Sequence, residues 1–190
     1  MMRRPERDER VQRDRGSGRS RRVRPTQQAV RDAIFNSLAA RVPGARVLDL
    51  FAGTGSLGLE ALRRGAQFAV FVEQHSALAT EIRDQLAAEG TAERAEVWRR
   101  DAMSAIRELG STGRQFDIVI ADPPYGEAWL PRVLRGVVTA DVLAPLGVIV
   151  AEGHWRDRPE PEPGLERYKE ARYGETVLWY YKQMEEEGVV

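Results

Sequence analysis

The chain has 190 residues, a formal net charge of zero from 29 basic and 29 acidic side chains, no cysteine and two histidines. This length suits one domain with a sizeable core, and the lack of cysteine excludes disulfides, thiolate metal sites and cysteine nucleophiles, so we expect no metal. A charged amino terminus and the absence of any run of about 20 apolar residues argue against secretion and membrane insertion, which favours a cytoplasmic protein.

The zero net charge conceals a basic segment at the amino end. Residues 1–24 contain ten arginines and four acidic residues, a local charge of +6, and almost nothing apolar. Such a segment cannot bury enough surface to offset the entropy of ordering it, so we expect a flexible extension over 1–24. Because arginine suits bidentate phosphate contacts and base stacking, RNA or DNA is a natural partner, with a merely solvated tail as the alternative.

The apolar pattern after Pro25 predicts helices that alternate with strands. Apolar residues at helical spacing indicate a helix over roughly 26–41, which Pro43 and Gly44 end. The next elements are strand 47–51, helix 56–64, strand 68–72, helix 77–89, strand 96–99, helix 103–109, strand 116–121, helix 129–138 and strand 148–152. Strands separated by helices imply a parallel sheet with right-handed crossovers.

The alternation stops after residue 152. Residues 157–164 read as a loop, and residues 166–173 and 176–182 face each other across Gly174 and Glu175 as a β-hairpin. A parallel sheet that finishes in an antiparallel hairpin predicts one doubly wound α/β domain over 25–184. The last residues, 185–190, are expected to fray.

A glycine-rich loop follows the first strand. Gly53, Gly55 and Gly58 match the spacing G-x-G-x-x-G, and Glu73 lies twenty residues after Gly53 at the end of the second strand. This spacing satisfies the dinucleotide-binding fingerprint. The spacing alone does not identify the cofactor. The glycines admit any ligand that approaches closely, and a carboxylate at this position can accept hydrogen bonds from the ribose hydroxyls of any adenosine-type cofactor.

Acidic residues stand at the ends of three successive strands, namely Asp49, Glu73 and Asp101. Asp49 would repel a pyrophosphate seated on the following helix, whereas it favours the ammonium and sulfonium groups of S-adenosyl-L-methionine (SAM). Asp101, followed by Ala102, is placed to accept a hydrogen bond from an adenine amino group. Each acid alone has the simpler explanation of a helix N-cap or an exposed strand end, but the three together favour SAM.

The fourth predicted strand runs directly into Asp122, Pro123, Pro124 and Tyr125. The two prolines fix the backbone and remove two N–H donors, so the loop offers a carboxylate and carbonyl oxygens as rigid acceptors. Such acceptors suit an exocyclic amine, because holding its hydrogens frees the lone pair to attack an electrophilic methyl group. Tyr125 supplies a face on which the base can stack. A turn that merely ends the strand is the alternative.

Together these residues resemble the class I SAM-dependent methyltransferases that modify exocyclic amines, and within them the RsmD family of 16S ribosomal RNA (guanine-N2)-methyltransferases. The resemblance covers roughly residues 24–182 and rests on residues 24–26, 31–36, 48–61 (LDLFAGTGSLGLEA), 73, 101–102, 122–125 and the closing hairpin. The motif Asp-Pro-Pro-Tyr alone is shared with enzymes that act on DNA adenine or on protein glutamine. Before Arg24 the Arg-rich extension replaces the short strand pair that is usual in the family.

The resemblance implies a Rossmann-like fold with a seven-stranded mixed sheet of order 3-2-1-4-5-7-6 and helices on both faces. It implies methyl transfer from SAM to the N2 amine of one guanine in 16S rRNA, in an assembled or partly assembled small ribosomal subunit, by a monomer. The implied catalytic residues are Asp122, Pro123, Pro124 and Tyr125. The implied cofactor-binding residues are Asp49, Phe51, Ala52, Gly53, Thr54, Gly55, Gly58, Glu73, Gln74, Asp101, Ala102 and Asn36. The implied substrate-binding residues are Arg24, Thr26, Arg31 and Tyr125.

Three other functions remain open at this point. A methyltransferase with the same loop could act on another amine, in DNA adenine, in another RNA guanine or adenine, or in protein glutamine. An NAD-dependent oxidoreductase would use the glycine loop and Glu73 but would leave Asp49 and the Asp-Pro-Pro-Tyr loop unexplained. A non-catalytic RNA-binding domain would use the Arg-rich extension but would have no need of a cofactor site.

Overall fold

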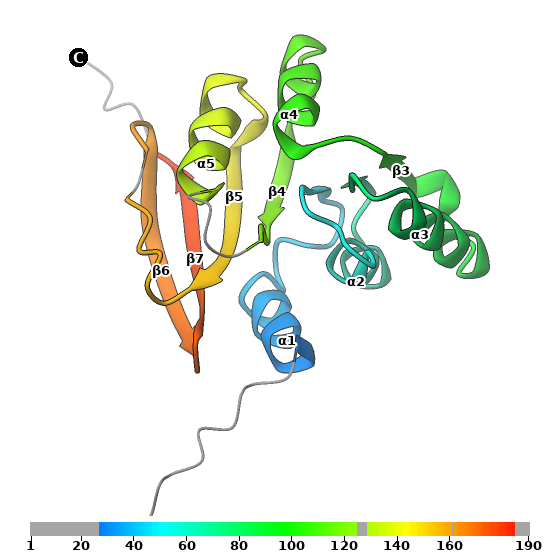
Figure 1. Cartoon of the computed structure of the whole chain (residues 1–190), viewed down its shortest axis with the longest axis horizontal. Helices are drawn as coiled ribbons and strands as arrows, with labels where there is room; N and C mark the ends of the chain where they lie inside the picture. The colour runs from blue at the N-terminus through cyan, green and yellow to red at the C-terminus, as the bar shows by residue number, and fades with distance from the viewer. Residues whose placement is uncertain (1–26, 125–128, 161, 185–190) are drawn as a thin grey trace, which may run out of the picture.

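The computed structural model describes residues 27–124, 129–160 and 162–184. Arg24, Thr26 and Tyr125, the expected extension 1–24 and the expected frayed end 185–190 lie outside these residues. The elements are α1 (Gln27–Ser37), β1 (Arg46–Asp49), α2 (Ser56–Arg63), β2 (Phe68–Val72), α3 (Ser76–Ala88), β3 (Ala95–Trp98), α4 (Ala102–Ser111), β4 (Phe116–Ala121), α5 (Trp129–Thr139), β5 (Leu143–His154), β6 (Leu165–Tyr173) and β7 (Thr176–Gln183) (Figure 1).

The strands of the described chain form one seven-stranded sheet of order β3-β2-β1-β4-β5-β7-β6, which confirms the predicted fold class and strand order. Strands β1 to β5 pair in parallel, and β7 runs antiparallel to both β5 and β6. The chain moves outward from β1 to β3 and then returns to β4 on the other side of β1. This reversal opens a crevice at the carboxyl ends of β1 and β4, where open α/β sheets bind ligands.

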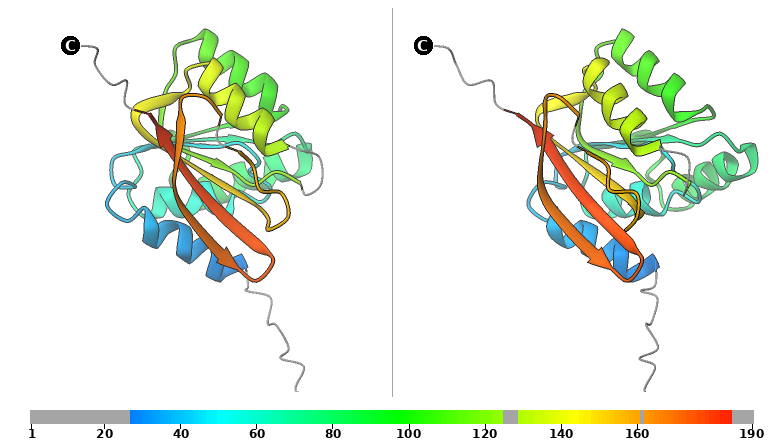
Figure 2. Two further views of the ribbon diagram at one scale, coloured as in Figure 1. Left: turned by 90° about the vertical axis from the view of Figure 1, so that its left-hand side faces the viewer. Right: turned by 60° about the vertical axis from the view of Figure 1, so that its left-hand side comes forward.

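Helices cover both faces of the sheet and bury one hydrophobic core on each. Apolar residues of α4 and α5 pack in one cluster, and those of α1, α2 and α3 pack in the other. Figure 2 shows α4 and α5 on one side of the sheet and α1 on the opposite side. No helix within the described ranges has the length and apolar content needed to cross a membrane.

Most element boundaries shift by one or two residues from the sequence prediction, and two shift further. Helix α1 ends at Ser37 and not near residue 41, because the chain continues in tight turns, with Arg41 N donating to Leu38 O at 2.7 Å, ahead of Pro43. Strand β5 begins at Leu143, which pairs with Phe116 before the register shifts. The segment with Pro145 and Gly147, which lies before the predicted strand 148–152, is therefore an irregularity within β5. The 3-10 turn Ala92–Arg94 was not expected either.

The third glycine of the loop motif is required for helix–sheet packing. A Cβ atom at Gly58 would lie 2.2 Å from Cε1 of Phe71, a fully buried ring on β2. We expect Gly58→Ala to lower the free energy of unfolding by about 1–3 kcal/mol, the usual range for overpacking. Urea denaturation measures this change.

A matched control is Gly136→Ala on α5, where the added Cβ would meet the flexible tip of Met103 at 2.8 Å. That tip can rotate away, and alanine is the better helix former, so this variant should lose little or gain. Phe71→Leu should restore part of the stability that Gly58→Ala loses. Equal losses in the two glycine variants, or no rescue, would contradict the packing role of Gly58.

Candidate active site

The carboxyl ends of β1, β2, β4 and β5 border a cavity of about 750 Å³, a volume suited to a nucleoside-sized ligand. It is the position that the strand order predicts for a ligand. The sequence-predicted residues on its wall are Arg31, Phe51, Ala52, Gly53, Thr54, Glu73, Gln74, Asp101, Ala102, Asp122, Pro123 and Pro124. Asp49, Gly55, Gly58 and Asn36 are not on the wall.

The glycine loop between β1 and α2 presents one glycine to the cavity and one to the core. Gly53 has φ +55°, and a Cβ there would meet nothing within 4 Å, so the loop leaves open space on the cavity side. Gly55 has φ +82°, and a Cβ there would lie 2.9 Å from Cγ1 of Ile82. Gly53 therefore admits a close ligand, whereas Gly55 allows the turn and the packing against α3.

Asp49 lies beneath the loop. Its side chain is 1% exposed, and its Oδ2 accepts a hydrogen bond of 3.1 Å from Gly58 N in the first turn of α2. Burial raises the pKa of Asp49 to about 7, opposed by the backbone hydrogen bond and reinforced by the nearby charges of Asp122 and Glu73. Asp49 therefore anchors α2 from beneath the loop and does not line the cavity, so its role in cofactor binding stays a prediction.

Glu73 ties the ends of β1 and β2 together. Its Oε2 accepts from Gly53 N at 2.9 Å and its Oε1 accepts from His75 N at 2.7 Å, while the side chain is 7% exposed. Each carboxylate oxygen can accept a second hydrogen bond. Glu73 therefore fixes the glycine loop and still offers acceptors to ribose hydroxyls.

Asp101 is the N-cap of α4. Its Oδ1 accepts from Ser104 N at 2.9 Å, and hydrogen bonds from Ser104 lower its pKa. The simpler explanation given for this acid, a helix N-cap, is thus realised. Asp101 nevertheless lines the cavity beside Ala102 and stays ionised at neutral pH, so its second oxygen remains an acceptor.

Helix α1 brings Arg31, but not Asn36, to the cavity. Arg31 lines the wall, and its Nε is buried without a hydrogen-bond partner among the described residues. Asn36 lies five positions later, about 140° further around the helix, and is exposed. The family-derived role of Asn36 in cofactor binding is therefore not supported by its position.

The loop after β4 places Asp122 beside a second acid, Glu152 of β5. Ala121 and Ala151 are register partners in parallel strands, so Asp122 and Glu152 follow at the same level, and both line the cavity. Burial raises the pKa of Asp122 to about 6 and that of Glu152 to about 8, the latter also through the charge of Asp122.

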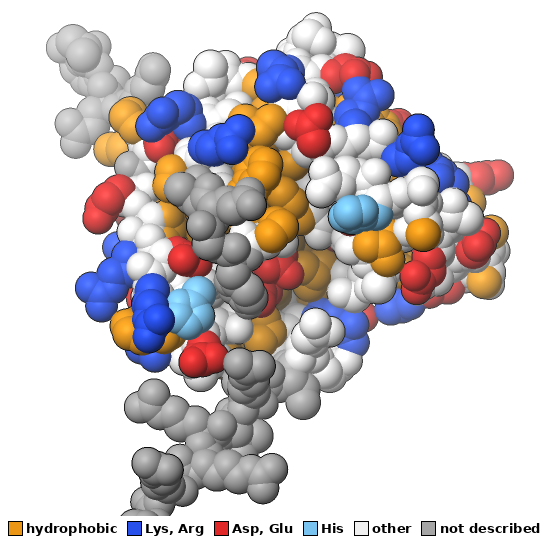
Figure 3. Space-filling model, in the orientation of Figure 1, with side chains coloured by type: hydrophobic (Ala, Val, Ile, Leu, Met, Phe, Trp, Pro, Cys, Tyr) orange, Lys and Arg blue, Asp and Glu red, His pale blue; other side chains and the backbone are white. Residues whose placement is uncertain are grey.

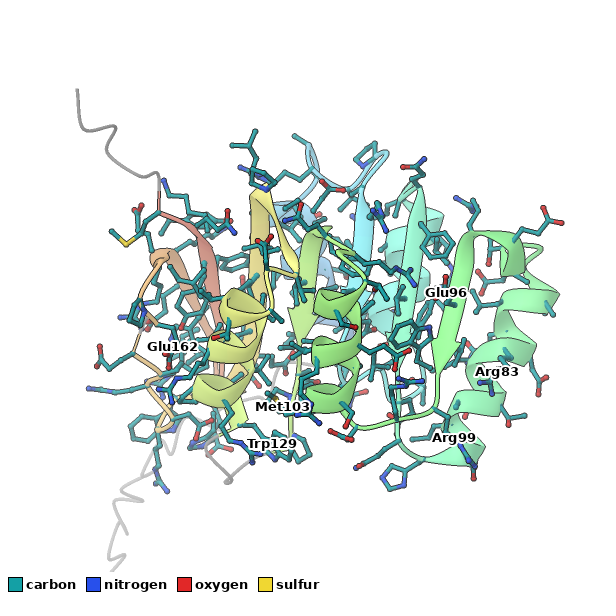
Figure 4. All side chains as sticks on the ribbon, turned by 90° about the horizontal axis from the view of Figure 1, so that it is seen from above. Arg83, Glu96, Arg99, Met103, Trp129 and Glu162 are labelled. Atoms are coloured by element: carbon teal, nitrogen blue, oxygen red, sulfur yellow. The ribbon has the colours of Figure 1, made fainter. Side chains whose placement is uncertain are left out.

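Sequence reasoning did not identify Glu152 or Trp129 as site residues. Glu152 ends an apolar stretch of β5. The predicted strand order places that strand next to the one that carries Asp122, so it was sufficient to place the two acids side by side. Trp129 begins α5 and packs edge-on against Phe51, with ring centroids 5.8 Å apart, on the cavity wall. Figure 4 shows Trp129 at the same end of the sheet as Met103 in the first turn of α4. The rings of Trp129 and Phe51 form an aromatic side of the cavity.

Arginines contact Trp129 on the cavity wall and Trp155, which directly follows β5. The guanidinium of Arg132 lies 4.7 Å from the ring centroid of Trp129, and those of Arg156 and Arg172 lie 5.1 and 4.9 Å from that of Trp155. Trp155 directly follows β5, and its N donates to Glu175 O at the same sheet edge. Figure 3 shows Lys and Arg side chains scattered over the face seen in Figure 1, among acidic side chains and a central apolar area. Such cations and ring faces suit a nucleic-acid backbone and unstacked bases.

The buried carboxyl groups predict an unusual pH dependence of stability. Asp49, Asp122 and Glu152 hold protons in the folded state up to pH values near 7, 6 and 8, whereas the unfolded chain releases them near pH 4. Between about pH 5 and 8 the folded state therefore binds more protons, so the free energy of unfolding should fall as pH rises, by about 1.4 kcal/mol per unit for each proton retained.

Urea denaturation at about pH 5.5, 7 and 8.5 measures this slope. Replacing all three carboxyl groups with neutral side chains (Asp49→Asn, Asp122→Asn and Glu152→Gln) should flatten it. A wild-type stability that rises with pH across this window would contradict the account.

Comparison with known proteins places the chain among methyltransferases. The family model described as conserved hypothetical protein 95 matches residues 13–182. The chain is 35% identical over 163 residues to the putative rRNA methyltransferase YlbH of Bacillus subtilis, covering 85% of this chain and 88% of that protein. It is 37% identical over 113 residues to ribosomal RNA small subunit methyltransferase D of Escherichia coli, covering 60% of this chain and 55% of that protein. The solved structure of the putative methyltransferase yhhF from E. coli superposes with a TM-score of 0.78 at 29% identity, covering 86% and 92% of the two chains.

Proposed function

Because the chain belongs to the conserved hypothetical protein 95 family and is an RsmD-like methyltransferase, we propose that it methylates the N2 amine of one guanine in small-subunit ribosomal RNA. One observation carries the proposal: the Asp122-Pro123-Pro124 loop and the Glu73-anchored glycine loop line the same cavity. An amine acceptor site and a nucleoside site therefore adjoin. The names of the rRNA methyltransferases to which the chain is similar support rRNA as the substrate.

The polar groups on the cavity wall fit SAM. Glu73 offers acceptors to ribose hydroxyls, Asp101 and Ala102 border the place for an adenine, and Gly53 leaves room for close approach. The unpartnered Nε of Arg31 suits a carboxylate such as the one at the amino-acid end of SAM. When bound, SAM supplies an electrophilic methyl group on a sulfonium. A pyrophosphate cofactor fits less well, because the carboxyl groups of Asp49, Glu73 and Asp122 would repel it.

The chain's own residues position the amine and line its site with apolar rings. With a pKa near 6, Asp122 is ionised at neutral pH and can accept hydrogens from an exocyclic amine. Pro123 is buried and holds the loop rigid, and the rings of Phe51 and Trp129 provide an apolar wall for a base. The hydrogen bonds to the amine free its lone pair, and solvent can take the proton that leaves after the methyl group arrives.

A comparison of substrates tests the proposal. The purified protein is incubated with methyl-labelled SAM and, separately, with small ribosomal subunits, naked small-subunit rRNA, adenine-containing duplex DNA and a glutamine-containing protein substrate. We expect label only in rRNA, with assembled or partly assembled subunits preferred, and a monomeric enzyme in solution. Label in DNA or protein, with none in rRNA, would overturn the proposal. Tight NAD binding without SAM binding would instead favour an oxidoreductase.

We expect the basic segment 1–24 to strengthen RNA binding by charge. Its +6 on a chain of zero net charge should bind phosphates, so affinity should fall with salt at a log-log slope of about −0.7 for each single-strand phosphate contact. Removal of residues 1–22 should weaken binding and flatten that slope. The turnover number at saturating RNA should stay near normal, because the cavity is left intact.

Fluorescence anisotropy at several salt concentrations measures this effect. A chain in which the arginines of residues 1–22 are replaced by serines, at unchanged length, is the matched control and should behave like the truncation. Unchanged affinity and slope in both variants would place the RNA contacts on folded arginines such as Arg156 and Arg172.

A further inference from the structure

Glu152 is a half-buried acid that the proposed chemistry has so far not used. It lies in β5, between β4 on one side and Leu178 of β7 on the other, and it lines the cavity beside Asp122. Among the described residues, neither carboxyl group has a hydrogen-bond or ion-pair partner. Burying such groups without partners costs free energy, so their retention in a cavity points to a ligand that supplies the partners.

The two carboxyl groups match adjacent atoms on one edge of guanine. That edge carries the N2 amine, the N1–H donor and the O6 acceptor in a row. Neighbouring strands are about 4.8 Å apart, so side chains that follow a register pair can reach neighbouring atoms of one base. With Asp122 on the N2 amine, the atoms next in line on the β5 side are N1–H and O6.

We propose that Glu152 selects guanine, with its carboxyl group accepting the hydrogen of N1 and donating its own hydrogen to O6 while Asp122 holds the N2 amine. The inference rests on the proposed methylation of guanine N2 and adds the residue that reads the rest of the base. It requires a protonated Glu152 beside an ionised Asp122.

The electrostatics of the cavity support that protonation pattern. Burial and the charge of Asp122 raise the pKa of Glu152 to about 8, so Glu152 is mostly neutral at pH 7 while Asp122 is mostly ionised. Among the described residues, the other charged groups on the wall are Arg31, Glu73, Arg100 and Asp101, and no arginine forms an ion pair with Glu152. A neutral carboxyl group has the same donor and acceptor pattern as a glutamine amide.

An experiment that changes both the side chain at position 152 and the base of the substrate tests whether Glu152 selects guanine. The substrate is small-subunit rRNA with guanine or 2-aminopurine at the methylated position, assembled into particles. 2-Aminopurine keeps the N2 amine but lacks both N1–H and O6. The wild type should methylate guanine about 10- to 100-fold more efficiently than 2-aminopurine, the value expected for two neutral hydrogen bonds.

Two variants of Glu152 separate base reading from a structural role. Glu152→Gln should keep most of the efficiency on guanine and the preference over 2-aminopurine. Glu152→Met, which keeps the length but removes both polar atoms, should lose about 10- to 100-fold on guanine and almost nothing on 2-aminopurine. Its SAM affinity should be unchanged and its thermal stability should rise, because a buried carboxyl group is gone. Glu93→Met, at an exposed acid outside the cavity, is the control.

The outcomes are distinguishable. Equal losses on both bases in Glu152→Met, or a loss of guanine preference in Glu152→Gln, would overturn the role of Glu152 while leaving the methylation intact. No N2-methylated product from wild-type enzyme on either base would overturn the proposed function itself. A preference that disappears only in Glu152→Met supports the inference.

Discussion

Asp122→Ala should lower the rate of methyl transfer by about 100- to 1,000-fold, the loss typical when one preorganised polar group of an active site is removed. The reason is that Asp122 is the acceptor that holds the amine hydrogens and frees the nitrogen lone pair. SAM affinity should change by less than about threefold, because this carboxylate faces the amine and the glycine loop is held by Glu73. Single-turnover kinetics and calorimetry measure the two quantities separately.

Asp84→Ala, at an exposed acid on α3, is the matched control and should behave like the wild type. The stability of Asp122→Ala should not fall, because a half-buried carboxyl group without a described partner is removed. Loss of activity can then not be assigned to unfolding. Wild-type methyl transfer by Asp122→Ala would show that the amine is held by other groups.

Glu73→Ala should weaken SAM binding by about 100-fold or more. The variant removes the acceptor for ribose hydroxyls and also leaves Gly53 N and His75 N without their acceptor, so the glycine loop loses its anchor. Each lost hydrogen bond to a charged group contributes about 1.5–3 kcal/mol. Calorimetric titration with S-adenosylhomocysteine gives the affinity without turnover.

Glu93→Ala is the control for Glu73→Ala, since it removes an exposed acid from the 3-10 turn Ala92–Arg94. Glu73→Gln should bind SAM with intermediate affinity, because an amide keeps one acceptor oxygen for only one of the two backbone N–H groups. If Glu73→Ala bound the cofactor as tightly as the wild type, Glu73 would be a structural residue alone and the nucleoside site would lie elsewhere on the wall.

The fold could be read from local patterns because each buried strand and helix has its own periodicity. The strands 68–72 and 116–121 appear at the expected residues, since both are short apolar runs between turn signals. The parallel strand order followed from the alternation together with the family resemblance. The start of β5 could not be read in this way, because Pro145 and Gly147 look like a turn unless the pairing of Leu143 with Phe116 is known.

The site was predicted in outline, and its details depend on tertiary contacts. Glu73 and Asp122 stand at strand ends, where order along the chain is sufficient to place them at one edge of the sheet. Asp49 has the same sequence signal, yet its hydrogen bond to Gly58 N turns it under the loop. Glu152 becomes notable only when β5 pairs beside β4. Trp129 becomes notable only when α5 packs near Phe51.

Mass spectrometry of nucleosides tests the central claim most directly. Small ribosomal subunits that lack the modification are incubated with the enzyme and with SAM carrying a trideuterated methyl group, and the rRNA is digested completely. The account predicts that the label appears as N2-methylguanosine at one rRNA position, and that it disappears with Asp122→Ala. Label in N6-methyladenosine, in a guanosine methylated on a ring nitrogen, or in no rRNA nucleoside would contradict the assignment of the cavity to guanine N2.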